Sequence, residues 1–129
     1  MARFRDKRQD SLTTRAEETV RTVIASLPDD LRTLAEKLPV FYEWEIARHW
    51  LGDGVEPDSL GLFSGPSLRD ADDFECIEAP AITLFLKNLS EYCDDEGLDF
   101  GDEVRTTYLH EFGHYLGFEE GDMEERGLL

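Results

Sequence analysis

Two histidines stand four residues apart near the end of the chain, in the segment LHEFGHYLG, with a glutamate directly after the first. In a helix, side chains at positions i and i+4 lie on the same face, with Cβ atoms about 5–6 Å apart. His110 and His114 can therefore each bring a ring nitrogen to about 2.0–2.1 Å from one zinc ion. Glu111 lies about 100° further around the helix, where its carboxylate can take a proton from water that the metal activates. The pattern predicts metal-assisted hydrolysis with two histidine ligands and a glutamate general base.

A zinc ion that does chemistry needs a third protein ligand, because three ligands leave the fourth position open for water. Gly117 is placed to end the helix in the left-handed conformation and to turn the chain back towards the metal. Glu120 is then the expected third ligand, with Glu119 and Asp122 as alternatives. We expect one zinc ion per chain, although two imidazoles and a carboxylate also suit other divalent metals.

The same residues have a simpler explanation, in which two exposed histidines lie by coincidence on an acidic helix. With 3 histidines in 129 residues, the bare H-E-x-x-H pattern arises by chance in roughly one chain in a hundred. The metal site is therefore the favoured interpretation.

The helix that carries the motif is predicted to begin near Asp102 as its N-cap and to end at about Gly117. One side of it is apolar at helical spacing and is expected to face the core. The opposite side carries the histidines, which are expected to face a cleft or solvent. The apolar side holds Val104, Tyr108, Phe112 and Leu116, with Leu109 beside them, and the opposite side holds Glu103, Thr106, Thr107, His110 and His114.

Apolar residues with helical spacing also predict a helical region in the first third of the chain. Between Leu12 and Leu38 they recur three or four residues apart. The sequence LPDD at 27–30 interrupts this period, and Asp29 or Asp30 can cap a second, shorter helix.

Strands are predicted where apolar and polar residues alternate or where an apolar run is short. VFYEWEI (40–46) alternates around aromatic residues, and APAITLFL (79–86) is the second clear strand. The segment 51–73 is rich in Gly, Pro, Ser and Asp, so we expect a loop around the short strand LGLF. LSEYCDDEGLD (89–99) predicts a turn of helix and a loop.

The composition favours one folded domain that acts on something other than nucleic acid. We expect residues 14–129 to form this domain and the basic residues 1–13 to form a flexible tail. The formal net charge of −17 disfavours nucleic acid, whose phosphates attract basic proteins. A cationic peptide or a metal ion suits this field better, although the charge also fits a solvated acidic surface.

The cellular location is expected to be the cytoplasm, without a membrane partner. No apolar run reaches the roughly 18 residues of a membrane span or has the form of a signal peptide. Cys76 and Cys93 fit no disulfide framework and are expected to be reduced. The oligomeric state stays open.

The segment VRTTYLHEFGHYLGFEEGDMEERGL, from Val104 to Leu128, resembles the C-terminal motif of the small bacterial zincin-like metallopeptidases, the minimal zincins. LGLFSG (60–65) is similar to the central loop and strand of that family, and APAITLFLKNL (79–89) to its edge strand. The resemblance extends over most of the chain from about Thr14. It implies an α/β (α+β) fold with an N-terminal helix, a small mixed or antiparallel sheet, and an active-site helix under the sheet's edge.

The resemblance also implies a set of site residues. Zinc would be bound by His110, His114 and an acidic residue at the position of Glu120, with Glu111 as the base. The last ligand is commonly aspartate in this family, so a glutamate at this position departs from its pattern.

We therefore expect a zinc-dependent peptidase that acts on peptides or flexible protein segments. A substrate peptide could pair with the exposed edge of the 79–89 strand beside the metal. Two alternatives stay open. One is a metal-stabilised module that binds an extended peptide without cutting it, and the other is a regulatory peptidase with one narrow target.

Overall fold

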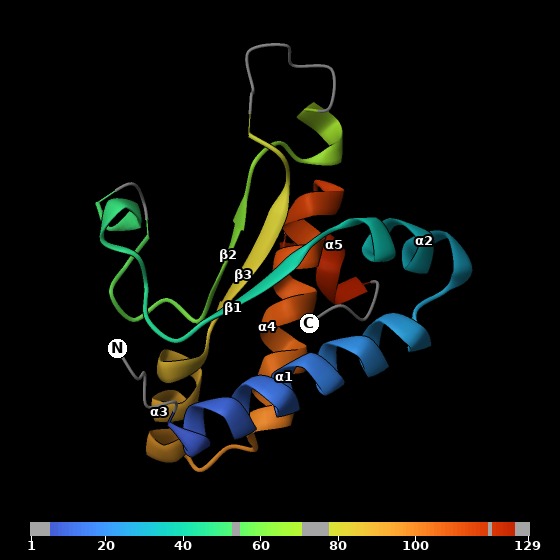
Figure 1. Ribbon diagram of the computed structural model, residues 1–129. Coiled ribbons are helices and arrows are strands. Elements are labelled where there is room, and N and C mark those ends of the chain that lie inside the picture. Colours follow the sequence, from blue (N-terminus) through green and yellow to red (C-terminus); the bar gives the residue numbers. More distant parts are fainter. Residues whose placement is uncertain (1–5, 53–54, 71–77, 119, 126–129) are drawn as a thin grey trace, which may run out of the picture.

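The structure is a computed structural model that describes residues 6–52, 55–70, 78–118 and 120–125 (Figure 1). The described residues combine helices with a small three-stranded sheet, which gives the predicted α+β fold. Among the described residues, none of the helices has both the length and the apolar character that crossing a bilayer requires. In chain order the elements are α1 (Lys7–Ser26), α2 (Asp29–Lys37), β1 (Val40–Glu43), η1 (Arg48–Trp50), β2 (Gly61–Ser64), η2 (Leu68–Asp70), β3 (Ala81–Phe85), α3 (Leu86–Glu96), α4 (Phe100–Leu116) and α5 (Glu120–Glu125).

The sheet is mixed, with strand order β1-β3-β2. β1 pairs with β3 in parallel, and β2 pairs with β3 antiparallel. The prediction that the 79–89 segment supplies the edge strand is therefore wrong, because β3 is the central strand and β2 is the edge strand that contacts α4. The burial of β3 explains its place, since Ile82, Leu84 and Phe85 are each 0% exposed, as is typical of a strand covered on both faces.

Helix α1 begins earlier than the sequence suggested. Asp6 caps it by accepting a hydrogen bond from the backbone N–H of Arg8, and Leu12 is buried in the core. Residues 7–13, expected to belong to a flexible tail, thus form the first turns of α1, and that part of the prediction is wrong. Residues 1–5 lie outside the described part of the chain.

Helix α3 is longer than predicted, and strand β1 is shorter. The segment expected to be one turn and a loop belongs to an eleven-residue helix that buries Leu89 and Cys93. It ends at Gly97, whose φ of 67° is left-handed. β1 stops at Glu43 rather than at Ile46. Cys76 lies outside the described residues.

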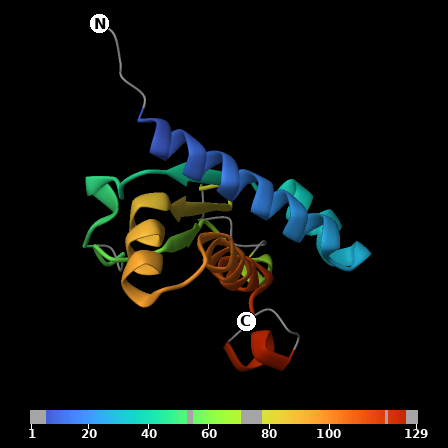
Figure 2. The same cartoon turned by 90° about the horizontal axis from the view of Figure 1, so that it is seen from below.

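Helix α4 is the element that carries the motif, and it begins three residues before the predicted start. Its N-cap is Asp99, whose side chain accepts a hydrogen bond from the backbone N–H of Asp102 at 3.0 Å. The predicted apolar stripe is confirmed, since all five of its residues are buried. Thr107 was expected on the open side, but it is only 7% exposed because β2 covers it. Figure 2 shows α4 nearly end-on, with α1 on one side of it and α5 on the other.

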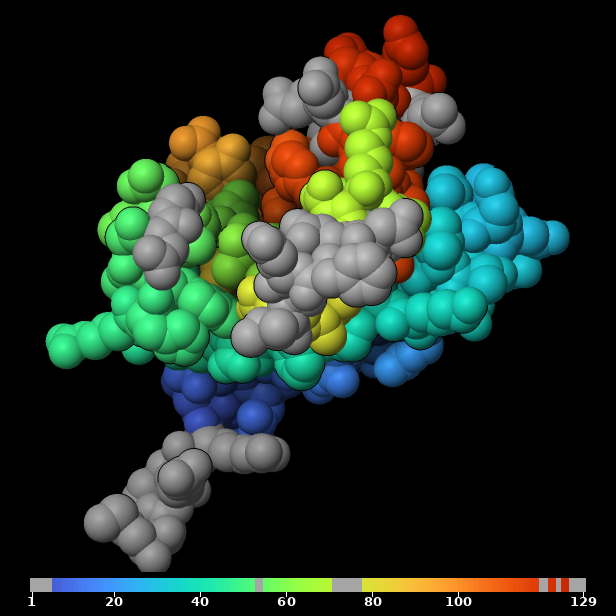
Figure 3. Space-filling view, turned by 90° about the horizontal axis from the view of Figure 1, so that it is seen from above, coloured from blue at the N-terminus to red at the C-terminus, as the bar shows by residue number. Residues whose placement is uncertain are grey.

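The C-terminal end of α4 is a Schellman turn, as the position of Gly117 predicted. Gly117 has a φ of 81°, and its backbone N–H bonds to the carbonyl of His114 at 3.0 Å. The N–H of Phe118 bonds to the carbonyl of Gly113 at 3.0 Å, which completes the motif. The side chain of Arg69 lies on Gly117, so that a Cβ there would meet its Cγ at 2.7 Å. Figure 3 shows the yellow-green atoms of η2 against the orange and red end of α4.

Candidate metal centre

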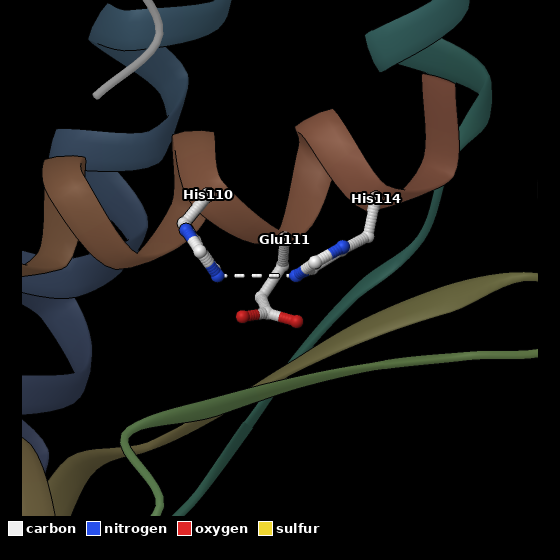
Figure 4. A group of neighbouring side chains, drawn as sticks. All are labelled: His110, Glu111 and His114. Carbon is white, nitrogen blue, oxygen red and sulfur yellow. Dashed lines mark hydrogen bonds between the residues drawn. The ribbon is translucent and has the colours of Figure 1, made fainter. Parts of the chain in front are cut away.

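Three side chains of α4 meet on the side of the helix that faces the sheet (Figure 4). The Nε2 atoms of His110 and His114 are 3.0 Å apart, and their ring centroids are 4.6 Å apart. One nitrogen of each ring and a carboxylate oxygen of Glu111 all lie within 4.8 Å of one another. His110 and Glu111 are partly buried, whereas His114 is exposed. The structure thus brings together the three residues that the motif singled out.

The geometry of the two rings fits one metal ion. Two nitrogens at about 2.05 Å from a tetrahedral zinc ion lie about 3.3 Å apart. The observed Nε2–Nε2 separation of 3.0 Å reaches that value with a movement of a few tenths of an ångström. Two imidazoles aimed at the same point are also a donor set that divalent metals such as zinc prefer. These residues could therefore hold a metal ion.

Glu111 is oriented by the edge strand. The backbone N–H of Phe63 in β2 donates a hydrogen bond to Oε1 of Glu111 at 2.9 Å. The carbonyl of Leu60 bonds to the N–H of Phe85 in β3, and backbone groups alternate along an antiparallel strand. The polar groups of Gly61 and Phe63 therefore point away from β3, towards the candidate metal centre. The sequence alone does not reveal this partner, because a backbone donor carries no residue-type signal and its direction depends on strand register.

A glycine allows β2 to approach α4 this closely. A Cβ on Gly61 would lie 2.7 Å from Cγ2 of Thr107, closer than real Cβ contacts. Two residues further along β2, the ring of Phe63 packs against Tyr115, with centroids 5.8 Å apart. β2 is thus fixed on α4 by a close contact at Gly61 and by an aromatic contact at Phe63, the residue that also donates the hydrogen bond to Glu111.

We predict that Gly61→Ala lowers the free energy of unfolding by about 1–3 kcal/mol, because the new methyl group overlaps Thr107 and displaces β2. Urea unfolding of the purified protein measures this loss. Thr107→Ser removes the methyl group that is met first, so the double variant should regain part of the lost stability. A single variant that unfolds at the same urea concentration as the parent would contradict the close approach of β2.

The third metal ligand stays a prediction. Glu120 is the first residue of α5, but its side chain lies outside the described part, as does Glu119. The side chain of Asp122 is described, and its carboxylate is not among the atoms that gather at the two histidines. Within the described residues, the gathered group consists of His110, Glu111 and His114.

The remaining histidine belongs to a different part of the molecule. His49 lies in η1, where its ring packs against Trp50 with centroids 5.3 Å apart. It is not in the gathered group. His49 therefore provides a control for effects that are specific to the motif.

The side of α4 that faces the core carries packing residues, and the buried Tyr108 is the example. Tyr108 is fully buried and stacks on Phe112, with centroids 6.0 Å apart. Burial raises the pKa of the Tyr108 phenol above its usual range, and the neighbouring Tyr42 adds to this rise. Tyr108 therefore stays neutral and packs in the core, as predicted, while His110 and His114 lie on the other side of the helix and Glu111 lies between the two sides.

Comparison with known proteins identifies the family. A family model of the zincin-like metallopeptidases matches residues 36–128, which include the sheet, α4 and the whole motif. The match begins at residue 36, later than the start near Thr14 that the resemblance suggested. No curated protein matched the chain. Because the match covers more than half of the chain and contains the gathered residues, the chain belongs to the zincin-like metallopeptidase family.

Proposed function

We propose that this protein is a zinc-dependent peptidase with one zinc ion per chain, held by His110, His114 and Glu120. The observation that carries the proposal is the convergence of two Nε2 atoms, 3.0 Å apart, beside a glutamate that the edge strand orients. Membership of a metallopeptidase family supports the same chemistry. The cytoplasmic location stays a prediction.

Glu111 is the general base of this proposal. A bound zinc ion would polarise the peptide carbonyl and lower the pKa of water to about 7. Oε1 of Glu111 is held by the N–H of Phe63, so the carboxylate is kept beside the two histidines. From this position Glu111 accepts the proton of the attacking water and later gives it to the leaving amine. The hydrogen bond restricts the side chain to one orientation before the substrate arrives.

The substrate is expected to be a peptide or a flexible protein segment that pairs with β2. β2 is the edge strand on the side of α4, and its outward backbone groups at Gly61 and Phe63 face the site. An extended peptide can add a strand at such an edge through main-chain hydrogen bonds. Because Glu111 already bonds the N–H of Phe63, the substrate would use the N–H and carbonyl of Gly61 and the carbonyl of Phe63. This proposal moves the docking edge from β3 to β2.

The experiment that tests the proposal combines metal content with cleavage. The purified protein should contain one zinc ion per chain and should cleave members of a mixed-peptide set, with products identified by mass spectrometry. A chelator should abolish cleavage, and added zinc should restore it. A large rise in melting temperature with zinc but no cleavage of any peptide would instead favour the peptide-binding module. Cleavage that persists without bound metal would overturn the proposal.

The third ligand is tested by three matched substitutions. We expect Glu120→Gln to weaken zinc binding more than tenfold, because it removes a charged ligand, whereas Glu119→Gln and Asp122→Asn should leave the affinity within about twofold of the parent. Competition with a fluorescent zinc chelator measures the three affinities. A loss of affinity in Glu119→Gln or Asp122→Asn rather than in Glu120→Gln would reassign the third ligand.

A further inference from the structure

A cavity of about 280 Å³ lies directly beside the candidate metal centre. Its walls come from α4, from α3 and from the residues that lead into β2, and they include His110 and Glu111. Its volume lies just below the range of about 300–1,000 Å³ that is typical of pockets for whole small ligands. The cavity is therefore suited to a single side chain, namely that of a substrate residue next to the bond that is cut.

The wall of the cavity combines one negative charge with an apolar and aromatic surface. Apart from the candidate metal-binding residues, Glu103 is the only carboxylate among the described residues that line it, and Leu60 and Tyr92 provide most of the remaining large side chains. Glu103 is partly buried, and its carboxylate forms no hydrogen bond or ion pair with any other residue that the structure describes. An unpaired carboxylate in a partly buried cavity favours a cationic ligand group.

Glu103 belongs to α4, and the effect of its charge on Cys93 shows that its carboxylate lies close to α3. Burial raises the pKa of the Cys93 thiol on α3, and the adjacent charge of Glu103 raises it further. Tyr92, the residue before Cys93, is 41% exposed and lines the same cavity. An aromatic face of this kind attracts a cation and also covers the aliphatic stem of a long side chain.

The distance between Glu103 and the candidate metal centre determines which substrate side chains are long enough to reach the carboxylate. Glu103 precedes His110 by seven residues, which corresponds to about 10 Å along the helix axis. An extended lysine side chain spans roughly 6 Å from Cα to its nitrogen, and arginine reaches slightly further. Together with the side chain of Glu103 itself, these lengths bridge the gap. Short or neutral side chains leave the carboxylate without a partner.

We propose that this cavity is a substrate side-chain pocket that selects lysine or arginine next to the cleaved bond, with Glu103 as the specificity-determining residue. This inference rests on the proposed peptidase function, because the same metal centre must bind the substrate. A second hollow of about 460 Å³ shares Leu60 and Tyr92 with the pocket and is lined by Asp58, Glu91 and Asp95. Its carboxylates extend the negative potential that attracts a cationic peptide.

Binding of three peptide hydroxamates to the zinc-loaded protein tests the inference without requiring turnover. The hydroxamate group anchors each probe on the metal, and the adjacent residue is lysine, norleucine or glutamate. Norleucine matches the stem of lysine but lacks the charge. We expect the lysine probe to bind roughly five- to thirtyfold more tightly than the norleucine probe, and the glutamate probe to bind most weakly. Isothermal titration calorimetry measures the three affinities.

Variants assign the preference to one carboxylate. Glu103→Gln should bind the lysine and norleucine probes equally, and Glu103→Asp should give an intermediate preference because its carboxylate is one methylene further away. Glu96→Gln removes the same charge from the end of α3, outside the pocket, and should keep the full preference. A parent protein that binds lysine and norleucine probes equally, or a Glu103→Gln variant that keeps the preference, would overturn the inference.

The outcomes separate this inference from the proposed function. Peptide cleavage without a charge preference would leave the peptidase standing and remove the pocket assignment. A lysine preference among the hydroxamates without cleavage of any peptide would remove the peptidase and keep Glu103 only as the group that selects a bound lysine side chain. If none of the three probes binds the zinc-loaded protein, both proposals fail.

Discussion

Glu111→Gln is expected to slow peptide hydrolysis by about 10²–10⁴-fold while the zinc content stays at one ion per chain. The amide group of glutamine cannot accept the proton of the attacking water, so the proposed general base is lost. The amide oxygen can still accept the hydrogen bond from the N–H of Phe63, which holds Oε1 in the parent. The variant should therefore melt at nearly the parent temperature. Initial cleavage rates, metal content and thermal melting measure the three properties.

Glu111→Ala separates the two roles of this side chain. It removes the base and also leaves the N–H of Phe63 without its acceptor, so it should be as inactive as Glu111→Gln and also less stable, by about 1–3 kcal/mol. A Glu111→Gln variant that cleaves as fast as the parent would show that Glu111 is not the base.

His114→Ala is expected to lose zinc, with an affinity reduced more than a hundredfold, because it removes one of the three proposed metal ligands. His114 is exposed, and its ring packs mainly on His110, so the fold itself should tolerate the change. In the parent, free zinc at about 100 times Kd should add about 2.7 kcal/mol to the free energy of unfolding. In His114→Ala this increment should disappear. Thermal melting with and without a chelator, together with elemental analysis, provides the measurement.

His49→Ala is the matched control, since it removes the histidine that lies in η1 beside Trp50. It should keep zinc, activity and the zinc-dependent rise in stability. Equal loss of zinc in His49→Ala and His114→Ala would mean that the metal is bound elsewhere.

The helical part of the site could be predicted from sequence because its geometry is local. The spacing of His110 and His114 fixes their shared face, and the period of the apolar residues fixes the buried face of α4. The position of Gly117 predicted the turn at the helix end for the same reason, because the left-handed backbone conformation needed there favours glycine. The sequence predicts Asp102 as the N-cap of α4, whereas Asp99 caps it. Both residues are good capping residues, and only the direction of the chain before the helix distinguishes them.

The strand order and register of the sheet could not be predicted from the sequence, because they depend on contacts between segments that lie far apart along the chain. The resemblance of the 79–89 segment predicts an edge strand, whereas β3, which lies in this segment, is buried along most of its length and lies at the centre of the sheet. The bond from Phe63 to Glu111 joins positions 48 residues apart and follows from the register of β2 on β3. The close contact of Gly61 with Thr107 follows from the same register, which explains why Thr107 was placed on the wrong side.

Helix α1 lies outside the segment that the family model matches, yet it provides one wall of the core. Its buried residues Leu12, Ala16, Val20 and Val23 belong to the same apolar cluster as the inward side of α4. We expect a fragment trimmed to the family boundaries to leave that side of α4 open to water and prone to self-association. A fragment made for functional work therefore has to include α1 with its cap at Asp6, and not only the recognised family region.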